Sequence, residues 1–204
     1  MGNARSAERL QSQMMVRKSP SLSLSFSQSE VELLQRSWTR VKISSENKLG
    51  SEILSTLISK RPDLAVYYKV DGTLPQQEID QLPRIQEIGQ RFTLTIDKLV
   101  NCLQSSEQGN EALTGLAQDF GQKHYVAQVD FSAENWLHVK RVTTEVILSF
   151  CARQEVRRTS DTKRLSEEVV WQKFMMFVVR EMKRGFVCTA LRQPTKLAVP
   201  SQTL

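Results

Sequence analysis

The sequence is poor in the two residues that interrupt regular structure most often, with 8 glycines and 6 prolines among 204 residues. Strand-rich folds need many tight turns, and turns draw heavily on glycine and proline. Their scarcity argues against a fold of many short strands and favours long helices joined by few loops.

Cysteine is also scarce. The three cysteines, Cys102, Cys151 and Cys188, form no C-x-x-C pair, and an odd number cannot all be paired in disulfides. We therefore expect a reducing, intracellular compartment rather than a disulfide-stabilised scaffold.

Other absences exclude further classes. No apolar run approaches the roughly 18 residues of a membrane span, and the N-terminus lacks the apolar core of a secretory signal. The net charge of +6 comes without a basic stripe interleaved with aromatics, so we do not expect nucleic-acid binding. With two histidines and no E-x-x-H or H-E-x-x-H pair, zinc, di-iron and Ser-His-Asp chemistry have little support.

The N-terminus does carry a motif. Met1 to Ser6 reads MGNARS and fits the pattern for N-myristoylation, with Gly2 as the acceptor. One acyl chain binds membranes only marginally, so a second signal is needed. Arg5, Arg9, Arg17 and Lys18 supply a weak basic patch for anionic lipid. We expect residues 1–26 to be a flexible basic leader that holds the protein at the cytoplasmic face of a membrane. The alternative is a polar leader in which Gly2 is accidental.

Helical spacing of apolar residues dominates the rest of the chain. Ser27 and Glu30 form a capping box that opens the first helix. Further helices are predicted at 46–59, 83–103, 110–124, 132–153 and 164–186. A short helix is also predicted that begins at Pro62 and ends at Tyr68. In this prediction residues 71–83 are mostly loop, Asn110 caps the fifth helix and Gly185 ends the last one. The body is thus an all-α domain over 27–186, followed by a flexible basic tail over 187–204.

His124 continues the inward stripe of its helix, four residues after Phe120. A histidine in that place is either a hydrogen-bonded core residue or a ligand, and spacing does not decide between them. A neutral imidazole facing an apolar helix across a slot is how helical proteins hold an iron porphyrin. His138 shares a face with Glu134, Arg141 and Glu145, and we expect it to be a surface residue.

Five segments together resemble the globin family, in the family's order and with compatible spacing over about residues 27–186. They are LLQRSWTRV (33–41), RPDLAVYY (61–68), IGQRFTLTIDKLV (88–100), LTGLAQDFGQKHYVAQVDF (113–131) and WQKFMMFVVREMKRGF (171–186). The chain is most similar in character to nematode and neuroglobin-like globins, among which N-terminal lipidation signals also occur. The resemblance implies seven to eight helices in a 3-over-3 arrangement around a haem pocket.

The resemblance also implies roles for individual residues. His124 would be the proximal ligand of the iron of haem b. Tyr68 would pack on the haem, Phe92 would form the distal wall, and Val129 and Phe131 would line the proximal corner. Two positions on the distal helix matter most. Ile88, just before Gly89, falls where the family usually has a distal His or Gln, and Arg91 would either reach the ligand or pair with a haem propionate.

The implied function is binding of O2 or another diatomic gas. Ile88 cannot donate a hydrogen bond to bound O2, so we expect redox, electron transfer or gas sensing rather than O2 storage. A nitrite-reductase-like side activity stays open, and so does the oligomeric state. Two alternatives remain at this point: a haem-free interaction protein with the globin fold at the membrane, and a cytosolic O2 carrier that needs no myristoyl group.

Overall fold

The computed structural model describes residues 25–103, 107–129, 132–153 and 161–192. These residues form eight α-helices and one 3-10 helix, and they contain no β-strand. The elements are α2 (Gln28–Ser45), α3 (Leu49–Lys60), η1 (Pro62–Leu64), α4 (Ala65–Tyr68), α5 (Gln76–Gln81), α6 (Pro83–Asn101), α7 (Glu107–Val126), α8 (Ala133–Arg153) and α9 (Asp161–Arg192). The predicted all-α class is confirmed.

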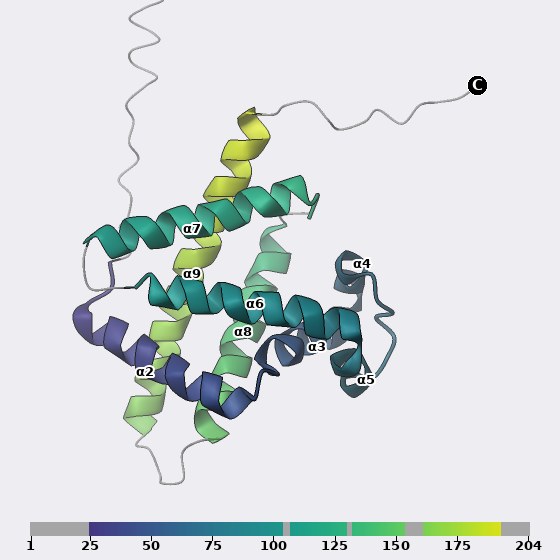
Figure 1. Cartoon of the computed structure of the whole chain (residues 1–204), viewed down its shortest axis with the longest axis horizontal. Coiled ribbons are helices and arrows are strands. Elements are labelled where there is room, and N and C mark those ends of the chain that lie inside the picture. The colour runs from purple at the N-terminus through teal and green to yellow at the C-terminus, as the bar shows by residue number, and fades with distance from the viewer. Residues whose placement is uncertain (1–24, 104–106, 130–131, 154–160, 193–204) are drawn as a thin grey trace, which may run out of the picture.

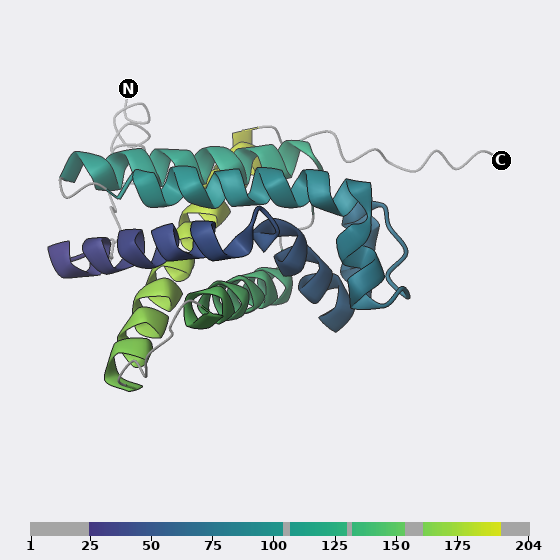
Figure 2. The ribbon, with the colours of Figure 1, turned by 60° about the horizontal axis from the view of Figure 1, so that its bottom comes forward.

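The helices form two layers of three. In Figure 1, α2, α6 and α7 run across α8 and α9, which lie behind them at a steep angle. Helix α3 completes the second layer, where it contacts α8 and also packs on α6. Figure 2 shows that α6 and α7 run alongside each other.

Helix α2 begins at the predicted capping box. The Ser27 hydroxyl accepts a hydrogen bond from the Glu30 backbone N–H at 3.3 Å, and the Glu30 carboxylate accepts one from the Ser27 backbone N–H at 2.7 Å. Each bond satisfies an N–H group that has no partner within the helix. Glu30 also pairs with Lys173 of α9 at 2.6 Å, so the start of α2 is fixed to the last helix.

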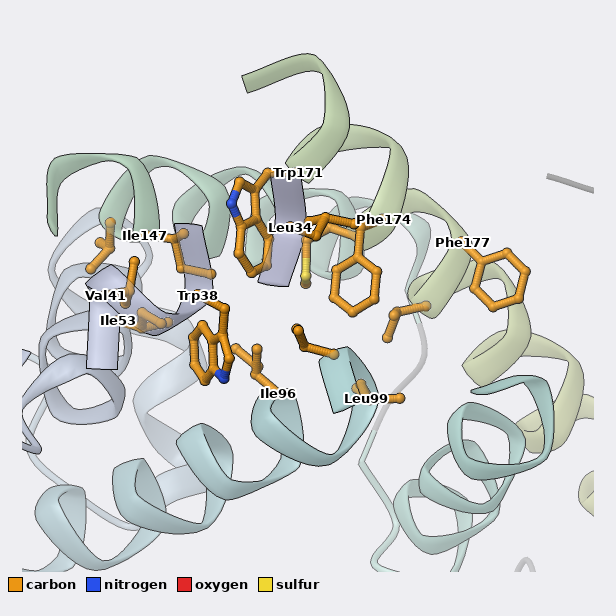
Figure 3. Close-up of a cluster of buried hydrophobic side chains, with 14 of the residues drawn as sticks. Leu34, Trp38, Val41, Ile53, Ile96, Leu99, Ile147, Trp171, Phe174 and Phe177 are labelled. Atoms are coloured by element: carbon orange, nitrogen blue, oxygen red, sulfur yellow. The ribbon is translucent and has the colours of Figure 1, made fainter. Parts of the chain in front are cut away.

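Aromatic side chains fill the space between the layers. Trp38, Trp171 and Phe174 are almost fully buried and pack together with aliphatic residues of α3, α6 and α8 (Figure 3). Both indole N–H groups are satisfied: Trp38 donates to Asp97 Oδ1 at 2.7 Å, and Trp171 donates to Ser37 Oγ at 2.9 Å. The core is therefore apolar without leaving these buried donors unpaired.

Two helix crossings depend on glycine. A Cβ on Gly89 would lie 2.4 Å from the backbone nitrogen of Ser51, and one on Gly50 would lie 1.8 Å from the carbonyl oxygen of Gly89. Helices α3 and α6 thus touch backbone to backbone, which fixes the rotation of α6 about its axis. At the second crossing, of α7 with α9, a Cβ on Gly121 would lie 1.9 Å from the carbonyl oxygen of Met182.

Some of the predicted boundaries are wrong. Helix α7 begins at Glu107, so Asn110 lies inside the helix and does not cap it. Helix α9 continues through Gly185 to Arg192, so residues 187–192 of the predicted tail are helical. The physical reason is that Gly185 serves packing: its Cβ would lie 2.0 Å from the carbonyl oxygen of Gln118.

Residues 71–83 are mostly loop as predicted, but Gln76–Gln81 form the short helix α5, because Ile79 is fully buried in a second small apolar cluster with Leu54 and Ile85. Val169 follows the apolar spacing of its helix, yet it is 54% exposed on α9.

Candidate functional site

A cavity of about 330 Å³ opens between α6 and α7. Its volume lies within the range of about 300–1,000 Å³ that is usual for small-molecule and cofactor sites. Most of its lining is aliphatic or aromatic, and it includes six of the seven residues predicted for the haem pocket: Tyr68, Ile88, Arg91, Phe92, His124 and Val129. The seventh, Phe131, lies outside the described residues, as does Gly2.

His124 is the clearest polar group of the cavity. Its Nδ1 lies 2.7 Å from the backbone carbonyl oxygen of Phe120, one turn earlier on α7. Because a carbonyl oxygen only accepts, Nδ1 must carry the proton, and Nε2 is left with its lone pair. Burial lowers the pKa of His124, although the bond to Phe120 opposes that shift, so the ring is neutral near pH 7. This is the tautomer that a metal ligand needs.

Packing holds the imidazole in its place. The ring of Trp136, at the start of α8, lies edge-on to His124 with centroids 5.0 Å apart and an interplanar angle of 65°. Gly121 is three residues before His124, and its contact with Met182 presses this part of α7 against α9. The orientation of His124 therefore depends on three helices.

Helix α6 forms the wall that faces α7. The Gly50–Gly89 crossing sets its register, and in that register Ile88 and Phe92 line the cavity. Arg91 also borders the cavity, but its side chain is 68% exposed and pairs with Glu87 on the same helix. The wall from α6 is therefore apolar inside and basic only at the mouth.

Tyr68 closes the cavity from α4. It packs between the two apolar clusters of the protein, and burial raises the pKa of its phenol to about 12. No hydrogen bond from its hydroxyl to any part of the described chain is present. A tyrosine hydroxyl in such a place usually has a hydrogen-bond partner, and the described part of the chain supplies none.

Sequence reasoning missed part of the lining. Leu54 and Leu57 of α3, Trp136 of α8, and Met175 and Met182 of α9 also border the cavity. Most of these residues follow the apolar periodicity of their helices, which identifies them as buried but does not distinguish core from cavity. Only the crossing of the helices decides which buried side chains face the open space.

The second histidine lies elsewhere. His138 is half-buried rather than fully exposed, and it borders a wide surface groove with Arg61, Arg141 and Glu145. Its Nδ1 lies 3.3 Å from Arg141 Nη2, and burial together with nearby cations lowers its pKa. The groove is lined mostly by charged and polar side chains, unlike the mostly apolar cavity at His124.

The side chains present fit a metal that arrives with its own ligands. Over the described ranges, no three His, Cys, Asp or Glu side chains come together as a metal-ion site. A single neutral imidazole facing apolar walls suits a planar metallated macrocycle, which needs one axial nitrogen and an apolar slot. None of the helices in the described ranges is long and apolar enough to cross a bilayer.

No protein-family model matches the chain, and no curated protein sequence matches it significantly. Solved structures do match it. A globin-like protein from C. elegans, Glb-12, superposes with a TM-score of 0.66 at 20% identity, covering 82% of this chain and 92% of that one. A Drosophila melanogaster globin gives 0.62 at 17% identity, covering 78% and 94%.

A third match is the haemoglobin of the botfly Gasterophilus intestinalis, with a TM-score of 0.57 at 18% identity, covering 77% of this chain and 99% of that one. The chain therefore has the globin fold, and its arrangement of three helices over three is the one predicted. At such identities the matches establish the fold alone, and the chemistry has to be argued from the cavity.

Proposed function

We propose that this protein binds haem b and, on it, a diatomic gas. The observation that carries the proposal is the unprotonated Nε2 of His124 in an apolar cavity of a globin fold. Two of the solved neighbours are a globin from Drosophila and a hemoglobin from the botfly, which supports the same function. The three cysteines form no C-x-x-C-H motif for covalent haem attachment, so the non-covalent b type fits best.

In this proposal each side chain has a definite task. His124 would supply a nitrogen ligand to the haem iron, and its Nδ1–H bond to Phe120 fixes the ring and raises its basicity. Ile88, Phe92 and Val129 keep water from the macrocycle. Haem itself, when bound, supplies an iron centre that binds small ligands and exchanges electrons.

We further propose that the role is gas sensing or redox chemistry rather than O2 storage. Ile88 has no donor for the partial negative charge of bound O2, and Arg91 is engaged with Glu87 at the surface. Such a charge-assisted hydrogen bond contributes on the order of 1.5–3 kcal/mol, so its absence from α6 favours rapid loss of O2 or oxidation to the ferric state. A nitrite-reductase-like side activity belongs to the same proposal.

The deciding experiment compares the two histidines. Purified protein should show a Soret absorption band, His124→Ala should lose it, and His138→Ala should keep it, because His138 lies outside the cavity. Circular dichroism then checks that both variants are folded. A colourless wild-type protein with full helical content would instead support a haem-free interaction protein with the globin fold.

The same haem-loaded sample tests the finer role. The ferrous protein in air should oxidise within minutes if its task is redox chemistry. A stable O2 complex that oxidises only over many hours would exclude the redox role.

We also propose that the protein works at the cytoplasmic face of a membrane. The support is the MGNARS motif with acceptor Gly2 and the basic residues that follow it. Gly2 lies outside the described residues, so this proposal depends on the sequence alone.

A further inference from the structure

We infer that the hydroxyl of Tyr68 donates a hydrogen bond to the small ligand held in the cavity, and that Tyr68 thereby determines which diatomic gases are retained. The inference depends on the haem binding proposed above, and it favours the sensing role over the redox role. In this inference α4 supplies the hydrogen-bond donor that α6 lacks.

The first support is the unpaired state of this hydroxyl. Tyr68 lines the cavity and packs against both apolar clusters, so most of its side chain is removed from water. Its oxygen makes no hydrogen bond within the described chain. It is also not one of the fully buried polar atoms that lack a partner. Tyr68 is half-buried and its oxygen is accessible, so the hydroxyl is free to bond a polar group in the cavity that Tyr68 lines. A ligand in the cavity is the partner that the position allows.

The second support is that the backbone fixes Tyr68. Tyr68 is the last residue of α4, and Lys69 follows it in the left-handed conformation with φ 56°. The Lys69 backbone N–H donates to the carbonyl oxygens of Ala65 and Val66, which closes the helix at this residue. Tyr68 is thus held by a helix end and two clusters, and not by a mobile loop.

The third support comes from the other polar groups of the cavity. Thr95 donates its hydroxyl to the carbonyl oxygen of Arg91 at 2.9 Å, and Arg91 pairs with Glu87. Ile88 has no polar atom. Tyr67 also lines the cavity but is 38% exposed, so water can satisfy its hydroxyl. Among the residues of α4 and α6 that line the cavity, Tyr68 is the half-buried donor that has no hydrogen-bond partner in the described ranges.

The chemistry of a buried phenol favours this role. Burial raises the pKa of Tyr68 to about 12, so the group stays protonated and can donate at any physiological pH. O2 bound to ferrous haem carries partial negative charge, whereas carbon monoxide stays nearly neutral. A donor therefore retains O2 more than carbon monoxide, which makes Tyr68 a specificity-determining residue.

The test compares Tyr68→Phe with Tyr125→Phe in the haem-loaded protein. Each variant loses one oxygen atom and keeps its ring, and Tyr125 packs on Phe186 and does not line the cavity. Haem content is measured from the Soret band, O2 and carbon monoxide dissociation by stopped flow, and the C–O stretch of the carbon monoxide complex by infrared spectroscopy. We expect Tyr68→Phe to keep its haem and to release O2 about tenfold faster or more, as loss of a charge-assisted bond predicts.

The remaining expectations separate the possible failures. In Tyr68→Phe the C–O stretch should move to higher wavenumber, while carbon monoxide release changes little. Tyr125→Phe should match the wild type. Unchanged O2 release and C–O stretch in haem-loaded Tyr68→Phe would overturn the inference and leave the proposed function standing. A wild-type protein that takes up no haem would overturn both.

Discussion

At the scale of single residues, the two histidines show how surroundings decide chemistry. His124 is buried against Trp136 with Nδ1 engaged and Nε2 facing the cavity. His138 sits at a charged groove beside Arg141. The same side chain is therefore suited to metal binding at one position and unsuited to it at the other.

The buried histidine predicts a pH dependence of stability. Its pKa is lowered in the folded protein by burial, so when pH falls below about 6.5 the unfolded chain takes up a proton that the folded chain resists. The free energy of unfolding of the haem-free protein should therefore decrease, and one such group contributes at most about 1.4 kcal/mol per pH unit. Carboxyl groups also titrate in this range of pH. The wild type is therefore compared with His124→Gln, which isolates the contribution of His124.

The measurement is urea unfolding at pH 7.5 and at pH 5.5. His124→Gln should lose less stability than the wild type between these two values, because it lacks the resisted proton. An equal loss in the two proteins would show that His124 is accessible to protons in the fold and is not held neutral.

At the scale of helices, the glycines at which helices cross do more to position the site than the helix caps do. Gly121 allows α7 to touch the backbone of α9 at Met182, and Gly185 allows the same at Gln118. Because His124 follows Gly121 by about one turn, this crossing sets how far the imidazole lies from α6. The crossing is thus part of the site as well as of the core.

Two glycine variants on α7 test this argument. A Cβ at Gly121 would lie 1.9 Å from the Met182 carbonyl oxygen, so Gly121→Ala must push the helices apart. We expect a loss of about 2–3 kcal/mol in unfolding free energy and weaker haem retention. Gly115 has no atom within 4 Å of its Cβ position, so Gly115→Ala should stabilise the protein by roughly 0.5–1 kcal/mol.

Both variants are measured by urea unfolding and by transfer of haem to an acceptor protein. The pair controls for helix propensity, since both changes put alanine into α7. If Gly121→Ala is as stable as Gly115→Ala, the close packing of α7 on α9 is wrong.

Most helices could be predicted from apolar spacing. The residues at which the helices begin and end could be predicted less accurately. The capping box of Ser27 is local chemistry and is confirmed. Gly185 looks like a helix end in the sequence, yet α9 runs through it because the glycine serves a contact with α7. Helix α5 was mostly missed because its stability comes from burying Ile79 against distant residues, which no local pattern reports.

At the scale of the whole molecule, the cavity exists only where helices meet. Side chains from α3, α4, α6, α7, α8 and α9 border it, and they come from positions spread over more than half of the chain. Its two sides differ: α7 contributes an imidazole, whereas α6 contributes aliphatic and aromatic side chains. This asymmetry is what a haem with one protein ligand and one open face requires.

The proposed membrane attachment is also a property of the whole molecule. In cells, Gly2→Ala should move the protein from the membrane fraction to the soluble fraction, because the acyl acceptor is removed. Asn3→Ala keeps the M-G-x-x-x-S pattern and should fractionate like the wild type. High salt should weaken attachment of the wild type, since one acyl chain needs help from basic residues.

The measurement is immunoblotting of both fractions, combined with mass spectrometry of the N-terminal peptide. Equal fractionation of wild type and Gly2→Ala would show that the protein does not depend on this motif. The globin fold and the haem proposal would be unaffected.

The sequence by itself determined the helical class, the order of the helices and the choice of His124, Ile88 and Phe92 as residues of one pocket. The helical class follows from apolar periodicity, whereas the choice of the pocket residues follows from the resemblance of short segments to the globin family. The tertiary structure alone decided the tautomer of His124, the withdrawal of Arg91 to the surface and the unpaired hydroxyl of Tyr68. These depend on which groups meet across helix crossings, and a linear pattern contains no such distances.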